Sequence, residues 1–393
     1  MACSFFRAVF FLKRKLNIKI ITVLCTAALM YFDANVTCMT HKNMQFSPFY
    51  ENYLINAIIA GNLNAVKDFV VEGVDINSNL ICEVTPLYIA AQEGHLEIVK
   101  YLIEHGANVN KACVRESTCL HVSVQKGHEK ITELLLNQGA NIDAPMRQGI
   151  TPLYIAAQEG NLIIMEHLIT RGANINALSY IGYTPLHIAI QKGHKKAVEL
   201  LVNHGANVSV HLNGGANPVC VAAWNGYLDI IKYLVQNGAD IDETSINGCT
   251  PLHVASAYGH LNVVEWLLRR GAKIDVRMNQ GATPLYVAAQ QGFLKIVEYL
   301  VAHGSNINEV GIDGCTSLHI ASQEGHSDVV EYLLTHNAKV NVINDYGKTA
   351  FQLAIEKRQF GLREREYENI IYLLKSYMNE RDICDIIKIA PAA

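Results

Sequence analysis

The sequence predicts an all-helical solenoid of about ten helix-turn-helix units that are joined by hairpin-like loops. One observation is a fixed period of 33 residues, and another is that each period holds two stretches with apolar residues at helical spacing. A period of this length is typical of stacked repeats, because one unit cannot bury its apolar face alone. The period is marked by Thr85, Thr118, Thr151, Thr184, Asn217, Thr250, Thr283, Thr316 and Thr349.

The unit that starts at Thr85 shows the expected order of elements. The Thr85 hydroxyl can cap a helix, and Pro86 suits the first helical turn. Gly94 tolerates a positive φ and should end this helix. Residues 96–102 carry apolar side chains at helical spacing, and Gly106 should end the second helix. A turn-rich connection then leads to the next threonine.

Three recurring motifs carry a family resemblance. They are Thr-Pro-Leu-His at 184–187 and 250–253, Gly-His at 94–95, and Gly-Ala-Asn-Val-Asn at 106–110. The chain therefore resembles the ankyrin repeat family over about residues 48–378. The resemblance implies that a partner binds a concave surface, which is formed by the loop tips and the exposed face of the first helices. It also implies that most histidines form hydrogen bonds between repeats and loops.

We expect three regions: a leader at 1–46, an ankyrin repeat domain at 47–378 and a tail at 379–393. Basic residues precede an apolar run, so residues 16–32 have the arrangement of a signal or anchor segment. This favours a secreted or membrane-anchored protein, with membrane association through residues 16–32. The alternative is an apolar leader without a targeting role and a cytoplasmic protein. The partly apolar tail is expected to pack on the last helix, and the alternative is a short ligand motif.

Composition excludes several classes of function. The net charge of -4 gives no general attraction to nucleic acid. Ten scattered cysteines without a Cys-x-x-Cys pair indicate mostly free thiols rather than a disulfide framework. No nucleophile or phosphate-binding motif is present, so we predict no enzyme activity and no cofactor. The nearest metal-ligand cluster has a spacing that fits no zinc pattern, so no metal is expected; it comprises Cys113, Cys119, His121 and His128.

The partner-binding prediction depends on where the repeat pattern breaks. Most first helices end in a Gln followed by a polar residue, but two neighbouring units carry Trp224-Asn225 and Ala257-Tyr258. The loop ahead of Thr184 holds aromatic and aliphatic residues where polar turn residues are usual. Exposed aromatics among polar neighbours have the composition of an interaction hot spot. The alternative is that Trp224 and Tyr258 pack on adjacent loops and only fill space. The predicted partner-binding residues are Tyr180, Ile181, Tyr183, Gln191, Lys192, Trp224, Asn225 and Tyr258.

The function expected from this pattern is a monomeric, non-catalytic scaffold that binds a protein partner. Two alternatives stay open. One is a secreted or host-directed ankyrin effector or toxin-like protein, which the N-terminal segment favours. The other is a cytosolic regulatory subunit or inhibitor of an enzyme.

Overall fold

The computed structural model describes residues 48–80, 83–359 and 363–378. The leader, with its segment 16–32, and the tail 379–393 lie outside these residues, so the targeting and tail-packing predictions are not tested. Within the described residues, no helix combines the length and the apolar character that crossing a bilayer requires.

The described residues form helices, with one isolated bridge between Met146 and Ile150, which confirms the all-helical prediction. The helices alternate between a first and a second helix of each repeat, and short 3-10 turns lie at η3 (Val114–Glu116) and η4 (Ile312–Gly314). The pairs are α3 (Pro48–Ile59) with α4 (Leu63–Val71), α5 (Pro86–Glu93) with α6 (Leu96–Glu104), α7 (Cys119–Lys126) with α8 (Glu129–Asn137), α9 (Pro152–Glu159) with α10 (Leu162–Thr170), α11 (Pro185–Lys192) with α12 (Lys195–Asn203), α13 (Pro218–Trp224) with α14 (Leu228–Gln236), α15 (Pro251–Tyr258) with α16 (Leu261–Arg269), α17 (Pro284–Gln291) with α18 (Leu294–Ala302), α19 (Ser317–Glu324) with α20 (Ser327–Thr335), and α21 (Ala350–Arg358) with α22 (Glu364–Tyr377).

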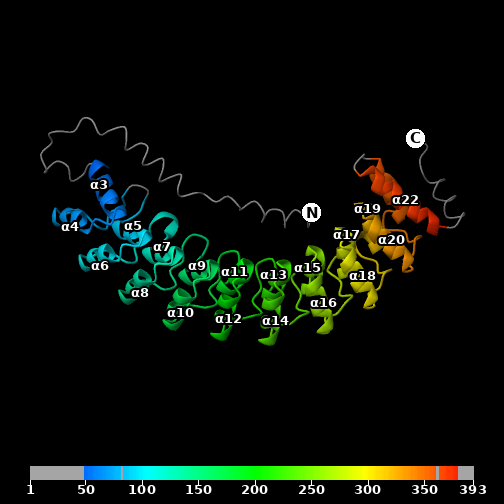
Figure 1. Cartoon of the computed structure of the whole chain (residues 1–393), viewed down its shortest axis with the longest axis horizontal. Coiled ribbons are helices and arrows are strands. Elements are labelled where there is room, and N and C mark those ends of the chain that lie inside the picture. Colours follow the sequence, from blue (N-terminus) through cyan, green and yellow to red (C-terminus); the bar gives the residue numbers. More distant parts are fainter. Residues whose placement is uncertain (1–47, 81–82, 360–362, 379–393) are drawn as a thin grey trace. The chain divides into compact units, whose positions relative to one another are not determined.

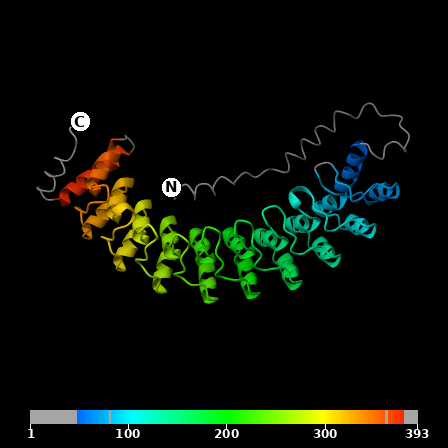
Figure 2. The same ribbon diagram turned by 180° about the vertical axis from the view of Figure 1, so that it is seen from behind.

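Contacts divide the chain into two compact parts, Met1–Asp75 and Ile76–Ala393. In the first part, α3 packs on α4. In the second part, each first helix packs on its own second helix and on the first helix of the next pair. Both ribbon views show this as two parallel layers of helices, with α5, α7 and their successors in one layer and α6, α8 and their successors in the other (Figures 1 and 2).

The helix starts follow from the cap residue of each repeat, and we name each repeat by that residue. In the Thr85 repeat, the backbone N–H of Tyr88 donates to Thr85 Oγ1 at 3.2 Å. Asn217 has the same role, because its Oδ1 accepts from the Cys220 N–H at 2.8 Å. These contacts satisfy N–H groups that lack a partner within the helix. The predicted caps are therefore present in the structure.

Histidines bridge neighbouring repeats in two alternating ways. At every second interface, a histidine directly follows the glycine that ends the first helix of one repeat. Its Nε2 donates to a carbonyl at the end of the first helix of the preceding repeat. This is so for His128 to Gln92, His194 to Gln158, His260 to Trp224 and His326 to Gln290, at 2.9–3.0 Å. At two of the intervening interfaces, His121 and His253 donate to carbonyls of the next repeat, those of Ile150 at 3.3 Å and Ala282 at 3.1 Å. In the same slot, Nε2 of His187 and His319 has no hydrogen-bond partner among the described residues. The bonds that do form satisfy buried backbone groups between repeats.

A second ladder of hydrogen bonds runs along the loops that follow the second helices. In this ladder, a side-chain oxygen of one repeat accepts a backbone N–H from the next repeat. The part of the chain that the structure describes holds seven such pairs: Asn77 with Asn108, Asn110 with Asn141, Asp143 with Asn174, Asn176 with Asn207, Asp242 with Lys273, Asp275 with Asn306, and Asn308 with Lys339. Ser209 occupies this slot in the Thr184 repeat, and no such bond joins it to Asp240 in the described residues.

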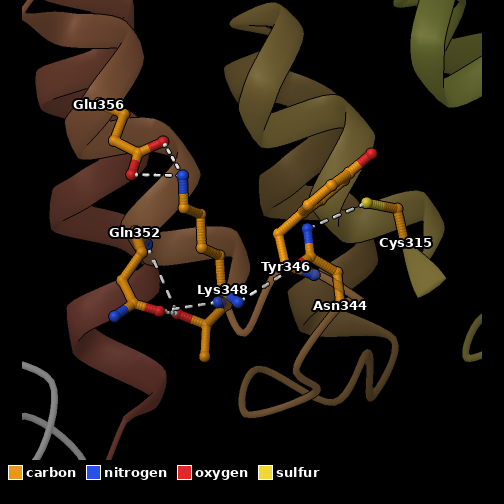
Figure 3. A network of polar contacts seen from close by, with 7 residues as sticks. Cys315, Asn344, Tyr346, Lys348, Gln352 and Glu356 are labelled. Carbon is orange, nitrogen blue, oxygen red and sulfur yellow. Dashed lines mark hydrogen bonds and ion pairs between the residues drawn. The ribbon is translucent and has the colours of Figure 1, made fainter. Parts of the chain in front are cut away.

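The last repeat differs from the others, as its sequence indicates. In the hairpin before α21, Asn344 accepts the N–H groups of Tyr346 at 3.1 Å and Lys348 at 2.9 Å (Figure 3). The Lys348 ammonium forms an ion pair with Glu356 at 2.8 Å. In the charged run at 363–368, the side chain of Tyr367 is buried and the others are exposed. The first turn of α22 therefore presents charged side chains to solvent, and Tyr372 and Tyr377 are exposed further along the helix.

Candidate partner-binding surface

Trp224 and Tyr258 form an aromatic pair between neighbouring first helices. Trp224 is the last residue of α13, and Tyr258 is the last residue of α15. Their ring centroids are 5.5 Å apart, with the planes tilted by 37°. Such a pair adds about 0.5–1.5 kcal/mol beyond the burial of area. Trp224 is half-buried, whereas Tyr258 keeps 39% of its surface exposed. The pair therefore fills space between two repeats and also presents aromatic surface to solvent.

Asn225 has a local structural role. Helix α13 ends at Trp224, one residue earlier than most first helices, and Asn225 follows as the C-cap. Its Nδ2 donates to the Val221 carbonyl at 2.9 Å. The half-buried Asn225 amide thus satisfies an end carbonyl of the helix.

Tyr180 and Ile181 lie at the tip of the hairpin that precedes α11. They are 72% and 59% exposed. The Tyr180 N–H donates to the Gln148 carbonyl at 2.9 Å, which ties this tip to the preceding one. Both side chains are therefore exposed to solvent, on a backbone that is hydrogen-bonded to the neighbouring tip.

Tyr183 differs from its neighbours in the same loop. It is half-buried, and its ring centroid lies 6.0 Å from that of His187. Burial raises the pKa of the Tyr183 hydroxyl. Tyr183 therefore belongs in large part to the packing between loop and helix. At the end of α11, Gln191 is half-buried and Lys192 is exposed.

Ile246 is an exposed tip residue that the sequence argument missed. It lies on the hairpin before α15 and is 68% exposed. The signal was available, because Ile246 is 246 − 180 = 66 residues after Tyr180 and so occupies the same slot two repeats later. The same slot holds Asn213 and Asn279, whose side chains donate to the carbonyls of Tyr180 and Ile246, both at 2.9 Å. Each of these two apolar tips is thus followed by an asparagine that donates to it.

The buried titratable groups serve the packing of the repeats. Burial lowers the pKa of His121, His187 and His253 to about 4. Burial also raises the pKa of the Cys119 thiol to about 12. In the predicted nearest metal cluster, His121 Nδ1 contacts the Thr118 hydroxyl at 2.9 Å and His128 Nε2 the Gln92 carbonyl at 3.0 Å. No group of three His, Cys, Asp or Glu side chains gathers to hold a metal ion within the described residues.

The sequence matches a protein-family model. The family model for ankyrin repeats (3 copies) matches residues 54–146, 141–211, 219–311 and 304–383. No curated protein matches the sequence. The matched ranges cover most of the chain. They leave out the beginning of α3 and residues 212–218, which include the Asn217 cap and the first residue of α13.

Proposed function

Because the chain belongs to the ankyrin repeat family, we propose that it is a non-catalytic scaffold with a protein partner on its first helices and hairpin tips. Ankyrin repeats generally mediate protein–protein interaction, and the family is typically non-catalytic. The observation that carries the proposal is the aromatic pair of Trp224 and Tyr258, which stands where most repeats carry polar residues.

Physical reasoning supports a partner at this place. Tyr180, Ile246 and Tyr258 expose 72%, 68% and 39% of their surface. Burying apolar surface is worth about 25 cal/mol per Å², so a partner that covers these side chains gains free energy. Their backbones lie in helix ends and linked hairpin tips, so little conformational entropy is lost on binding. Aromatic anchors on a fixed backbone are typical of interaction hot spots. The partner-binding set thus centres on Tyr180, Ile181, Trp224 and Tyr258, with Gln191 and Lys192 at its edge.

The double variant Trp224→Ala/Tyr258→Ala tests the proposal. Hot-spot side chains contribute about 2 kcal/mol or more each, so the loss of one should lower the affinity for the partner at least about 30-fold. The double variant should lose more, up to about 1000-fold if the two contributions add. Proteins that bind the full chain but not the variant identify the partner, and calorimetry with the purified partner then measures the loss.

Trp266→Ala is the matched control. Trp266 is half-buried on the second helix α16, with the Arg270 guanidinium 5.4 Å from its ring centroid. Its loss should lower stability but leave the affinity unchanged. Unchanged affinity in a folded double variant would instead show that Trp224 and Tyr258 serve packing alone.

The place where the scaffold acts is a separate question. The sequence of residues 16–32 favours export, and thus a secreted or host-directed effector; an enzyme regulator in the cytosol is the alternative. N-terminal sequencing of the mature protein, combined with cell fractionation, separates these two. An intact Met1 in the soluble cytosolic fraction would contradict export.

A further inference from the structure

The hairpin tips form a hydrogen-bonded ridge along the repeats. Backbone N–H groups of Arg147, Tyr180, Asn279 and Asp345 each donate to a carbonyl in the tip of the preceding repeat, at 2.9–3.0 Å. The Asn213 and Asn279 amides add bonds of 2.9 Å to the preceding tips. We call this the tip ridge, and we follow seven of its exposed side chains: Arg115, Arg147, Tyr180, Ile181, Ile246, Asp313 and Asp345. These bonds join the tips before α7, α9, α11 and α13 into one group, the tips before α15 and α17 into a second, and the tips before α19 and α21 into a third. The spacing of the side chains within each group is therefore set before a partner arrives.

Charge changes sign along the tip ridge. Arg115 and Arg147 are exposed in the tips before α7 and α9. Asp313 and Asp345 are exposed in the tips before α19 and α21. Between them lie the apolar tips of Tyr180, Ile181 and Ile246. The two ends of the ridge thus differ in charge, one basic and the other acidic. The middle is apolar, and Val114 and Tyr346 add exposed apolar surface near the ends.

The first helices reinforce the basic end. Lys126 and Lys192 are exposed in the last turns of α7 and α11. Two acidic side chains lie among them: Glu116 in the tip before α7 and Glu159 at the end of α9. The Gln158 amide donates to Glu159 at 3.0 Å. Four cations therefore face two anions here. In the described residues, no ion pair joins any of these four cations to a carboxylate; they are Arg115, Lys126, Arg147 and Lys192.

We propose that the partner binds through an extended segment in which acidic residues precede or follow an aromatic or aliphatic anchor. The acidic residues face Arg147 and Lys192, and the anchor contacts Tyr180, Ile246 and Tyr258. The inference rests on the proposed function and adds the chemical nature of the bound segment and the direction in which it lies along the repeats. Complementary charge fixes the register and speeds association, while the apolar contacts supply most of the affinity. The carboxylates of Asp313 and Asp345 repel the acidic end of the segment, so it is bound in one orientation.

The geometry gives the length of the segment. Neighbouring packed helices are about 10 Å apart, so three repeats from Arg147 to Ile246 span about 30 Å. An extended chain covers at most about 3.3–3.6 Å per residue, so about nine residues reach from the acidic group to the last anchor.

A random 12-residue peptide library displayed on phage, selected on the full chain, tests the inference. We expect the enriched peptides to combine Asp or Glu with Trp, Phe, Tyr or Leu. Their affinity should fall at least tenfold in Arg147→Glu/Lys192→Glu, and the salt dependence of binding should become weaker. Lys130→Glu/Lys295→Glu makes the same charge change on the second helices α8 and α18, and it should leave the affinity within about twofold.

The outcomes separate the two proposals. Peptides that depend on Trp224 and Tyr258 but not on Arg147 and Lys192 would overturn the acidic segment and leave the scaffold proposal standing. Peptides that depend on neither pair would overturn both. Enrichment of Lys and Arg, or no enrichment of any peptide, would also contradict the acidic segment.

Discussion

Lowering the pH from 6.5 to 4 is expected to unfold the repeat array, because the buried histidines at its repeat interfaces must then take up protons. His121, His187 and His253 are at most 1% exposed, and burial lowers the pKa of each from 6.5 to about 4. The unfolded chain therefore binds more protons than the folded one over this range. Their contribution to stability is complete above pH 6.5 and is lost as the pH falls towards 4.

The expected loss of folding stability is large compared with the marginal stability of a typical domain. A shift of one pKa unit corresponds to 1.36 kcal/mol, so each of these histidines accounts for about 3 kcal/mol. Three of them together amount to about 10 kcal/mol, which is comparable with the total stability of a typical domain. Circular dichroism and urea unfolding at a series of pH values would measure this loss.

His253→Gln isolates the effect of one histidine. Glutamine already occupies this slot in the last repeat, where Gln352 Oε1 accepts the Thr349 N–H at 2.9 Å and completes the same capping box. The variant should therefore keep the cap and lose about 3 kcal/mol less between pH 6.5 and 4 than the unsubstituted chain.

Tyr286→Gln is the control in the same slot. Burial raises the pKa of Tyr286, so this hydroxyl does not titrate in acid. The substitution should lower stability by a similar amount at every pH from 4 to 6.5. An acid profile of His253→Gln that coincides with that of the unsubstituted chain would contradict the assignment.

Gly292→Ala is expected to destabilise the array by about 3 kcal/mol, because a neighbouring repeat occupies the space that a methyl group needs. Gly292 ends α17 with φ +75°, and an added Cβ would lie 2.4 Å from Nδ1 of His326. A residue other than glycine in this left-handed conformation costs about 1 kcal/mol. Displacing the His326 ring from the Gln290 carbonyl, which it meets at 3.0 Å, costs about 1–3 kcal/mol more.

Gly304→Ala provides the matched comparison in the same repeat. Gly304 has φ +94°, but an added Cβ would meet no atom within 4 Å. We therefore expect only the backbone cost of about 1 kcal/mol. In a His326→Ala background, the stability cost of Gly292→Ala should fall to the same value. Urea unfolding of the four variants and the unsubstituted chain measures these costs, and equal costs for Gly292→Ala and Gly304→Ala would refute the steric argument.

The partner-binding surface was only partly accessible to sequence reasoning. The repeat pattern marks Trp224 and Tyr258 as exceptions, because most repeats hold polar residues there. Burial was not accessible, and the structure makes Trp224 half-buried and assigns the Asn225 amide to the end of its helix. Ile246 was missed because a single isoleucine in a loop gives no signal by itself. Its meaning becomes clear only when the structure shows that it is exposed and that it occupies the same repeat slot as Tyr180.

The sequence by itself determined the all-helical repeat architecture, the cap residues and the glycines that end the helices. These follow from local chemistry, namely hydroxyl or amide caps, helical apolar spacing and residues that tolerate positive φ. Only the tertiary structure decided which side chains face solvent and which meet across a repeat interface. Contacts such as that of His326 with Gln290 join residues of different repeats. They depend on how one repeat packs on the next, and no local pattern specifies that arrangement.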